Sequence, residues 1–405
     1  MNKTKHILYL SHRIPFPPNK GDKIRSFNEI KFLSQHHTLD LIALADDPED
    51  MAYEKALEKY CRHVKIISLN QTAAKLKGGL NLISGKSITQ GYFYQKQMQR
   101  TYDSWIQSND YDVIFCFSSP MAEYIFNGPT SLKKAKSVTC IMDFCDLDSD
   151  KWLQYSLKKP FPVDLLFRME GNRLLEFEKK INQRFDDTIF VSHGEARLFR
   201  NCFPGAQNVR VIPNGVDYDY FSSEKVNSTH LFPSPMIMFS GAMDYYANID
   251  GVTWFAKEIF PFVKKRMPRI EFFIVGRNPD PGIKRLEKYP GITVTGFVDD
   301  IRPYYKAADI CIIPLRVARG VQNKVLESMA MAKPVVATSI AIQGIKPDKG
   351  KDVAVADTEQ QFSDVIIKLL THPTLKKQLG INARKYVVVN HNWISSLKGI
   401  LDFRQ

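Results

Sequence analysis

Short apolar runs alternate with longer amphipathic stretches along the chain. Apolar runs of this length are typical of buried strands, and their alternation with helical segments is typical of a parallel α/β sheet. We therefore predict two series of strands. The first series comprises KHILYLS (5–11), TLDLIALAD (38–46), VKIISL (64–69), VIFCFS (113–118), SVTCIMDF (137–144), DTIFVS (187–192) and VRVIP (209–213). The second comprises PMIMFSG (235–241), IEFFIVG (270–276), ITVTGF (292–297), DICIIPL (309–315), PVVAT (334–338) and VAVAD (353–357).

A turn and a polar stretch separate the two series: PNGVD at 213–217, then SSEKVNSTHLFPSP at 222–235. This composition is typical of a hinge and linker. We therefore predict an α/β fold of two Rossmann-like domains, residues 1–215 and 216–389, facing one central cleft. The tail is predicted to be helical with a break near 390–392. Its last part, 390–405, is expected to cross back onto the first domain; the alternative is that it caps the second.

Composition sets limits on the class of protein. With 405 residues the chain is too long for one core, and 44% apolar and 24% charged residues argue against disorder. The six cysteines are scattered without a Cys-x-x-Cys pair, which predicts thiols in a reducing cytoplasm. No apolar run approaches a membrane span of ~18 residues. A formal charge of +13 implies acidic partners without choosing among nucleotide, nucleic acid and anionic membrane.

The most specific segment is RGVQNKVLE, residues 319–327, which follows one predicted strand and precedes another. Gly320 permits a turn that other residues avoid, and a helix that begins near Asn323 offers free N–H groups and a positive dipole end to an anion. Lys324 adds a full charge. Glu327 shares a helix face with Asn323, and its carboxylate can accept hydrogen bonds from two adjacent sugar hydroxyls. Arg319 and Gln322 complete this predicted diphosphate and ribose site.

Two other strand ends of the second domain carry glycine. Gly241 in FSGAMDYYANIDG and Gly276 in FFIVGRNPDPG mark tight exits from strands. Asn248 is expected to cap the helix that follows the first of them. Arg277 is a candidate diphosphate contact, although a solvated surface arginine explains it too. Parallel strands bind ligands at their carboxyl ends, so these residues are predicted to meet at one edge of the sheet.

The first domain has a comparable segment, PFPPNKGDKIR, at residues 15–25. Gly21 at the start of the predicted helix lets backbone approach a ligand, and Asp22 can cap that helix. A proline-rich turn with an N-cap explains everything except the density of Lys20, Lys23 and Arg25. Both interpretations stay open.

Four carboxylates follow the fifth predicted strand in DFCDLDSDKW, residues 143–152. Asp146 and Asp148, or Asp148 and Asp150, have the Asp-x-Asp spacing that can hold a divalent ion on a diphosphate. Nothing else in the sequence completes an oxygen-ligand set, so we predict no metal site and no cofactor. The alternative that we prefer is an acceptor or catalytic loop, with Asp143 and Asp146 as the candidate catalytic residues.

Other nucleotide chemistry finds little support. The sequence has no Gly-x-Gly-x-x-Gly at the first helix and no Walker lysine loop. Basic residues are interspersed with carboxylates rather than gathered on an aromatic-rich face, so nucleic acid is not a predicted partner.

Taken together, these motifs resemble the family 4 glycosyltransferases, retaining enzymes of the GT-B fold, over nearly the whole chain. VIPNGVD, the helix start at 323–327 and KPVVAT carry the family likeness. HRIPFPPNKGDKIRSFNE, MDFCDLDSDKW, FSGAMDYYAN and PLRVARGVQNKVLESMAMA are similar to the sugar transferases associated with PEP-CTERM/exosortase exopolysaccharide systems.

The resemblance implies an acceptor-side first domain and a nucleotide-sugar-binding second domain. It makes Glu327 the ribose-binding carboxylate, Gly21 the glycine of the loop over the donor phosphates, and Lys324 and Arg277 diphosphate contacts. Two departures stand out. Arg319 occupies the position of the usual sugar-binding Glu, and Ala242 and Met243 replace the Arg and Lys that commonly follow the glycine equivalent to Gly241. Asp143 or Asp146 stands closest to the place of the family's acceptor-side His.

We therefore predict a cytoplasmic, metal-independent retaining glycosyltransferase that uses a nucleotide sugar and a glycan or lipid-linked acceptor in exopolysaccharide biosynthesis. A nucleotide-sugar epimerase of the same fold and a catalytically silent partner of a polysaccharide assembly complex are the alternatives. The basic stretch 151–184, which includes Lys158, also suggests peripheral contact with the inner face of an anionic membrane. An ordinary core-facing helix with a solvated basic side explains that stretch as well.

Overall fold

The structure is a computed structural model that describes residues 4–129, 138–157, 159–227, 232–318 and 320–402. It divides into two compact units. The first unit runs through Ile212 and resumes at Leu397, and the second is Pro213–Ser396. The predicted boundaries, after residue 215 and before residue 390, lie a few residues away from these.

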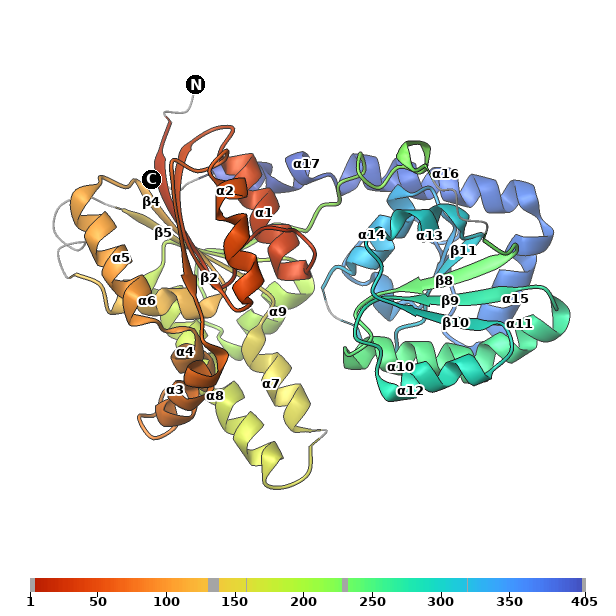
Figure 1. Cartoon of the computed structure of the whole chain (residues 1–405), viewed down its shortest axis with the longest axis horizontal. Coiled ribbons are helices and arrows are strands. Elements are labelled where there is room, and N and C mark those ends of the chain that lie inside the picture. Colours follow the sequence, from red (N-terminus) through yellow and green to blue (C-terminus); the bar gives the residue numbers. More distant parts are fainter. Residues whose placement is uncertain (1–3, 130–137, 158, 228–231, 319, 403–405) are drawn as a thin grey trace. The chain divides into compact units, whose positions relative to one another are not determined.

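The first unit is built on a seven-stranded parallel sheet with the order β3-β2-β1-β4-β5-β6-β7. Figure 1 shows α1 and α2 on one side of this sheet and α5 and α6 on the other. Its strands are β1 (His6–Ser11), β2 (Thr38–Ala45), β3 (His63–Ser68), β4 (Val113–Phe117), β5 (Thr139–Cys145), β6 (Asp187–Phe190) and β7 (Val209–Val211). Its helices are α1 (Gly21–Leu33), α2 (Glu54–Leu57), α3 (Gln71–Asn81), α4 (Ile88–Phe93), α5 (Lys96–Ser108), α6 (Ala122–Phe126), α7 (Asp148–Ser156), α8 (Val163–Arg184) and α9 (His193–Cys202).

The second unit repeats the design with a six-stranded parallel sheet in the order β10-β9-β8-β11-β12-β13. Helices α13 and α14 lie on one side of it and α10 and α12 on the other (Figure 1). The strands are β8 (Met236–Ser240), β9 (Glu271–Val275), β10 (Ile292–Gly296), β11 (Ile310–Ile313), β12 (Val335–Ala337) and β13 (Ala354–Val355). The helices are α10 (Tyr246–Trp254), α11 (Phe260–Arg266), α12 (Pro281–Lys284), α13 (Arg302–Ala307), α14 (Asn323–Ala330), α15 (Glu359–Thr371) and α16 (Pro373–Asn390), followed by α17 (Trp393–Leu397) at the border between the units.

These sheets follow from the apolar runs of the sequence. Every residue of β4, β8 and β11 is buried, as expected for central strands covered on both faces. Each sheet reverses its order at one point, between β1 and β4 in the first unit and between β8 and β11 in the second. All thirteen predicted strands are present, and the predicted α/β architecture of two Rossmann-like domains is confirmed.

The chain end returns to the first unit, as predicted. Helix α16 ends at Asn390 and α17 begins at Trp393, so the expected break is present. Leu397 and Ile400 are fully buried, whereas Ile394 is 60% exposed. Among the described residues, no helix combines the length and the apolar character that crossing a membrane requires.

Candidate functional site

The predicted donor residues of the second unit gather at the carboxyl ends of β8, β9 and β11. The sheet reverses its order between β8 and β11, and such switch points are where open α/β sheets bind ligands. Gly241 follows β8, Gly276 and Arg277 follow β9, and the turn after β11 leads into α14. Residues that are more than 80 positions apart in the sequence therefore share one edge.

Two glycines allow the backbones of the loops after β8 and β9 to touch where these loops cross. A Cβ at Gly276 would lie 1.7 Å from the carbonyl oxygen of Gly241, so only glycine fits there. A Cβ at Gly241 would lie 2.8 Å from Nδ2 of Asn248 and 3.2 Å from Nζ of Lys324. The ammonium group of Lys324 therefore stands directly beside the bare backbone of Gly241, where a ligand can approach both.

Lys324, in the first turn of α14, is held at this edge by neutral groups. Its Nζ donates to Oδ1 of Asn248 and lies 4.5 Å from the ring centroid of Phe239. Asn248 in turn donates to the carbonyl of Ala242 at 2.8 Å, so it braces the loop after β8 instead of capping α10 as predicted. Burial lowers the pKa of Lys324 to about 7, with the nearby Glu327 charge opposing the shift.

Glu327 lies one turn further along α14 and belongs to a chain of hydroxyl groups. The hydroxyl of Tyr305 donates to Oε2 of Glu327 at 2.9 Å and lies 2.6 Å from the hydroxyl of Ser240. Burial raises the pKa of Glu327, while the Tyr305 hydrogen bond and the Lys324 charge counteract part of the rise. Tyr305 was not predicted as a site residue, because it lies in α13 and reaches Glu327 only through the fold.

The start of α14 has the form that an anion site requires. Gly320 has a φ of 58°, in the left-handed region that favours glycine, and its carbonyl lies 2.2 Å from where a Cβ of Gly344 would be. The helix begins at Asn323, as predicted, after Gln322, and no side-chain hydrogen bond caps it. Its first N–H groups and its positive dipole end therefore lie at the same turn as Lys324. Arg319 lies outside the described residues.

Arg277 lies in the loop after β9, next to the crossing of the glycines. Its carbonyl accepts a hydrogen bond from the Met243 N–H at 2.9 Å, which ties this loop to the one after β8. In the described part of the chain, no carboxylate forms an ion pair with its guanidinium group. Arg277 is thus a second cation at the same edge whose charge is not neutralised by the protein.

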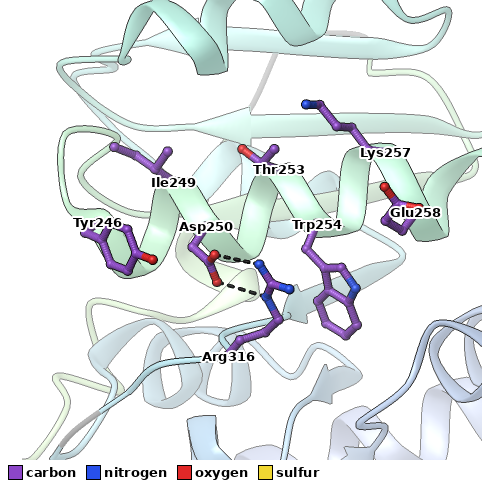
Figure 2. A pocket seen from close by; sticks show the side chains of 8 residues that line it. All are labelled: Tyr246, Ile249, Asp250, Thr253, Trp254, Lys257, Glu258 and Arg316. Atoms are coloured by element: carbon purple, nitrogen blue, oxygen red, sulfur yellow. Dashed lines mark hydrogen bonds and ion pairs between the residues drawn. The ribbon is translucent and has the colours of Figure 1, made fainter. Parts of the chain in front are cut away.

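A separate hollow lies along α10, outside this edge (Figure 2). It is lined by residues of α10 and the short turn after it, and by Arg316 from the loop after β11. Arg316 makes two bonds to the carboxylate of Asp250, at 2.6 and 3.0 Å, and its guanidinium lies 5.6 Å from the ring centroid of Trp254. Because Arg316 and Asp250 pair with each other, the charge of Arg316 is neutralised within the protein.

In the first unit, Gly21 and Asp22 form the first turn of α1. Gly21 is exposed, and Lys20, whose side chain makes no capping bond, precedes the helix. Asp22 accepts from Arg13 Nη1 at 2.7 Å and lies 3.4 Å from Nε2 of His12, so it does not cap α1 as predicted. Burial alone would raise the pKa of Asp22, but His12 and Arg13 overcome it and hold the pKa below its ordinary value.

Asp143 lies at the end of β5 in a buried ionic cluster. Its Oδ2 accepts from Nη2 and Nε of Arg25 at 2.6 and 3.0 Å, and Arg25 also contacts Glu29 at 3.0 Å. The Tyr9 hydroxyl donates to the other oxygen of Glu29 at 2.6 Å. Because Asp143 and Glu29 are fully buried, this position suits a residue that orders the loop, not one that touches substrate.

Asp146 has a different environment, although it follows Asp143 by only three residues. The residue is exposed, at the turn between β5 and α7. Although part of the residue contacts solvent, the protein packed around its carboxyl group, together with the charges of Glu195 and Asp148, raises the pKa of that carboxyl to about 7. A carboxyl that titrates near neutral pH can both accept and return a proton, so Asp146 is the stronger of the two predicted catalytic residues.

The second unit matches a known family. Residues 234–372 match the family model described as "Glycosyl transferases group 1". This match covers every predicted donor residue of the second unit, from Gly241 to Glu327. This part of the chain is therefore similar to the group 1 glycosyl transferases.

Relatives and solved structures extend the likeness to the whole chain. A Klebsiella pneumoniae protein described as an uncharacterized 44.6 kDa protein in the cps region is 22% identical over 95% of this chain and 96% of its own. The structure is similar to sucrose-phosphate synthase of Thermosynechococcus elongatus (TM-score 0.66, 16% identity, 98% and 97% covered). It is also similar to HepE of Anabaena, solved in complex with UDP and glucose (TM-score 0.65, 14% identity, 98% of both chains). The family match and the shared fold support a glycosyltransferase.

Proposed function

We propose that the chain is a retaining, metal-independent glycosyltransferase that moves a sugar from a nucleotide diphospho-sugar to a glycan or lipid-linked acceptor. The observation that carries this proposal is the arrangement of Lys324 and Glu327 on the first turns of α14, beside the partly exposed backbone of Gly241. Cation and helix N-terminus suit a diphosphate, and the carboxylate one turn away suits the two hydroxyls of a ribose.

The chemistry follows from where charge develops. When the bond between the sugar and the diphosphate breaks, negative charge grows on the leaving oxygen. We infer that Lys324, Arg277 and the first N–H groups of α14 stabilise it. A reaction in which the acceptor attacks from the face that the diphosphate leaves requires no protein nucleophile. Asp146, with a pKa of about 7, is the group that we assign to receive the acceptor's proton.

The biological setting is proposed from the relatives. The Klebsiella relative is described by its place in a cps region, which supports a role in exopolysaccharide biosynthesis. An association with PEP-CTERM/exosortase systems rests on the sequence motifs. HepE was solved with UDP and glucose, so UDP-glucose is the first donor to test. A lipid-linked acceptor would bring the enzyme to the inner face of a membrane.

A thermal-shift screen with UDP-, GDP- and ADP-sugars tests the proposal, because a ligand that binds the folded state raises its stability by mass action. The donor that binds is then incubated with and without acceptor glycans, and the products are analysed. Transfer that requires acceptor, with the anomeric configuration kept, is the expected result. A new nucleotide sugar formed without acceptor would identify an epimerase instead, and a chain that binds no nucleotide sugar would be the silent partner of an assembly complex.

A further inference from the structure

One end of the first unit exposes apolar side chains that the glycosyl transferase chemistry does not use. Helices α7 and α8 form a hairpin that projects from the sheet, and its tip points away from it (Figure 1). Leu157 and Phe161, in the connection between the helices, are 82% and 81% exposed, and Leu165 in the first turn of α8 is 56% exposed. Large apolar side chains that lie this far out gain nothing from the core of the protein.

A second set lies on α3 and just after it. Leu76, Leu80 and Ile83 are 67%, 64% and 86% exposed. Their spacing of four and three residues puts them on one face of a helix. The opposite side of α3 is the packed one, with Ala74 and Gly78 buried. An amphipathic helix normally turns its apolar stripe inward, so this outward stripe needs another explanation.

Both sets belong to the same end of the unit. Arg173, in the middle of α8, donates through Nη1 to the carbonyl of Leu82 at 2.9 Å and to that of Lys86 at 3.2 Å. The Glu170 carboxylate accepts from the N–H groups of Ile88 and Thr89 at 2.5 and 2.9 Å and so caps α4. These bonds fix the α3–α4 segment against α8. We call the six residues Leu76, Leu80, Ile83, Leu157, Phe161 and Leu165 the apolar end.

Cations surround the apolar end. Lys75 and Lys77 flank Leu76 on α3, and Lys86 follows Ile83; all three are exposed. Residues 71–102 contain no Asp or Glu. On the hairpin, Lys159 lies between Leu157 and Phe161, and Arg168 lies one turn after Leu165; both are exposed too. Lys86 pairs with Glu123, and Asp164 lies beside Leu165. Lys75, Lys77, Lys159 and Arg168 still outnumber that carboxylate, so the apolar residues are interleaved with net positive charge.

We propose that the apolar end docks onto an anionic lipid bilayer. Leucine and phenylalanine side chains insert at the boundary between headgroups and acyl chains, while the lysines contact anionic headgroups at ~1 kcal/mol each. The tip of the α7–α8 hairpin and the apolar stripe of α3 are separate projections with lysines between their apolar residues. A fluid, negatively charged surface can adapt to both. A protein partner of fixed shape would instead match a continuous apolar patch with few lysines, because lysine is depleted in protein interfaces. The predicted basic stretch at 151–184 thus forms only half of the surface, and α3 supplies the other half.

Vesicle sedimentation with the full chain tests the proposal. We expect binding to vesicles that contain phosphatidylglycerol and little binding to pure phosphatidylcholine, with loss of binding at high salt. The triple variant Leu157→Ser, Phe161→Ser, Leu165→Ser and the triple variant Leu76→Ser, Leu80→Ser, Ile83→Ser should each lower the partition coefficient by about tenfold or more, since each removes the insertion of three side chains. The variant Lys75→Glu, Lys77→Glu leaves the apolar residues in place and should weaken binding to anionic vesicles alone.

The matched control is Phe262→Ser with Phe297→Ser in the second unit, where the two side chains are 61% and 72% exposed. This control should bind vesicles like the parent chain. Thermal unfolding of each variant tests whether the first unit is still folded. If an apolar variant is unfolded, vesicle binding by the folded variant Lys75→Glu, Lys77→Glu tests the proposal instead. Equal, negligible binding to both kinds of vesicle would overturn the proposal, and so would dimerisation through these residues in sedimentation velocity without lipid. Vesicle binding needs no sugar donor, so its failure is distinct from failure of glycosyl transfer.

Discussion

The N-terminal turns of α1 and α14 both follow a strand that borders the switch point of its sheet, β1 in the first unit and β11 in the second, yet their charges have opposite surroundings. Each helix carries basic residues near its start. In the first unit Lys23 pairs with Asp50 at 2.6 Å and Arg25 with Asp143 at 2.6 Å, both out of contact with water. In the second unit Lys324 is held by the amide oxygen of Asn248, and Glu327 by a tyrosine hydroxyl.

The difference shows whether the charges in each unit stabilise the fold or are left to interact with a ligand. Cations paired with buried carboxylates stabilise the fold and have little attraction left for a ligand. A cation held by neutral groups can still attract an anion. Its burial raises the free energy of the charged form until an anion binds beside it. We therefore expect the start of α14, and not the start of α1, to bind an anion.

The largest effect is expected from breaking the buried pair of the first unit. Arg25→Met leaves Asp143 and Glu29 buried without their counter-charge and should lower the free energy of unfolding by about 3–5 kcal/mol. The control Lys151→Met removes an exposed pair at 3.7 Å from Asp148 and should cost less than ~1 kcal/mol. Chemical denaturation measures both. If Arg25→Met leaves the stability unchanged but abolishes donor binding, Arg25 contacts the ligand. The contrast between the starts of α1 and α14 would then be wrong.

The mirror experiment in the second unit is Glu327→Ala. Loss of two charge-assisted hydrogen bonds at ~1.5 kcal/mol each should weaken donor binding roughly a hundredfold, while the fold stays intact. Isothermal titration calorimetry with the donor measures this. Glu224→Ala, at an exposed glutamate of the same unit, is the control and should bind normally. Unchanged donor affinity in Glu327→Ala would end the assignment of Glu327 to the ribose.

Asp146 offers a sharper test within the first unit, because its neighbour Asp143 is in the buried cluster. If Asp146 receives the acceptor's proton, kcat should fall as pH drops below about 7 and the carboxyl becomes protonated. Asp146→Asn should lower kcat roughly a hundredfold and abolish that acid limb. Asp148→Asn removes one of the charges that raise the pKa of Asp146, so its acid limb should shift to lower pH. An Asp146→Asn enzyme with the parent pH profile would show that the proton goes elsewhere.

Lys324 makes the second unit sensitive to pH in the opposite direction. Its pKa of about 7 means that the free side chain is largely neutral above that pH, and an anionic diphosphate favours the protonated form. Donor binding must then take up a proton, so affinity should fall by up to about tenfold per pH unit above 7. Calorimetry between pH 6 and 9 in buffers of different ionisation enthalpy measures the uptake. Lys324→Met should bind weakly and without this dependence, whereas Lys265→Met, at an exposed lysine of the same unit, should behave as the parent does.

The smallest expected effect is that of a chelator. Since Lys324, Arg277 and the start of α14 supply the positive charge for the diphosphate, transfer should proceed at the same rate with EDTA. Rates measured with EDTA, and then with added manganese, check this. Activity that disappears with EDTA and returns with manganese would instead assign Asp146 and Asp148 to a metal.

The sequence predicted the strands and the start of α14 because these depend on local pattern. Four to six consecutive apolar residues suffice to define a buried strand, and Gly320, Asn323 and Lys324 are neighbours in the chain. The roles of the donor residues stay predictions until they are tested. What could not be predicted depends on partners far away in the sequence. The cluster of Lys20, Lys23 and Arg25 suggests an anion site until the fold brings Asp50 and Asp143 to it.

The same limit explains the residues that were missed. Tyr305 and Ser240 have ordinary polar side chains in a helix and a strand, with no spacing that marks them. Tyr305 meets Glu327 across 22 residues of sequence, and Ser240 meets Tyr305 across 65. Asn248 was predicted as a helix cap, and its contact with Lys324 spans 76 residues. The outward face of α3 is a different case, since the stripe of Leu76, Leu80 and Ile83 is visible in the sequence. There the periodicity indicates a helix face, and only the fold shows that this face points outward.

The return of the chain end to the first unit has a consequence for biosynthesis. Leu397 and Ile400 are fully buried, and the carbonyl of Gly399 accepts a hydrogen bond from Nη1 of Arg210 on β7 at 2.5 Å. A ribosome releases residues 4–212 first, but the piece that covers β7 emerges only after all of Pro213–Ser396 has been made. The half of the protein that is translated first is therefore the last to be completed. The nascent first unit therefore cannot complete its folding until the second unit has left the ribosome. Until then an apolar strip beside β7 stays uncovered.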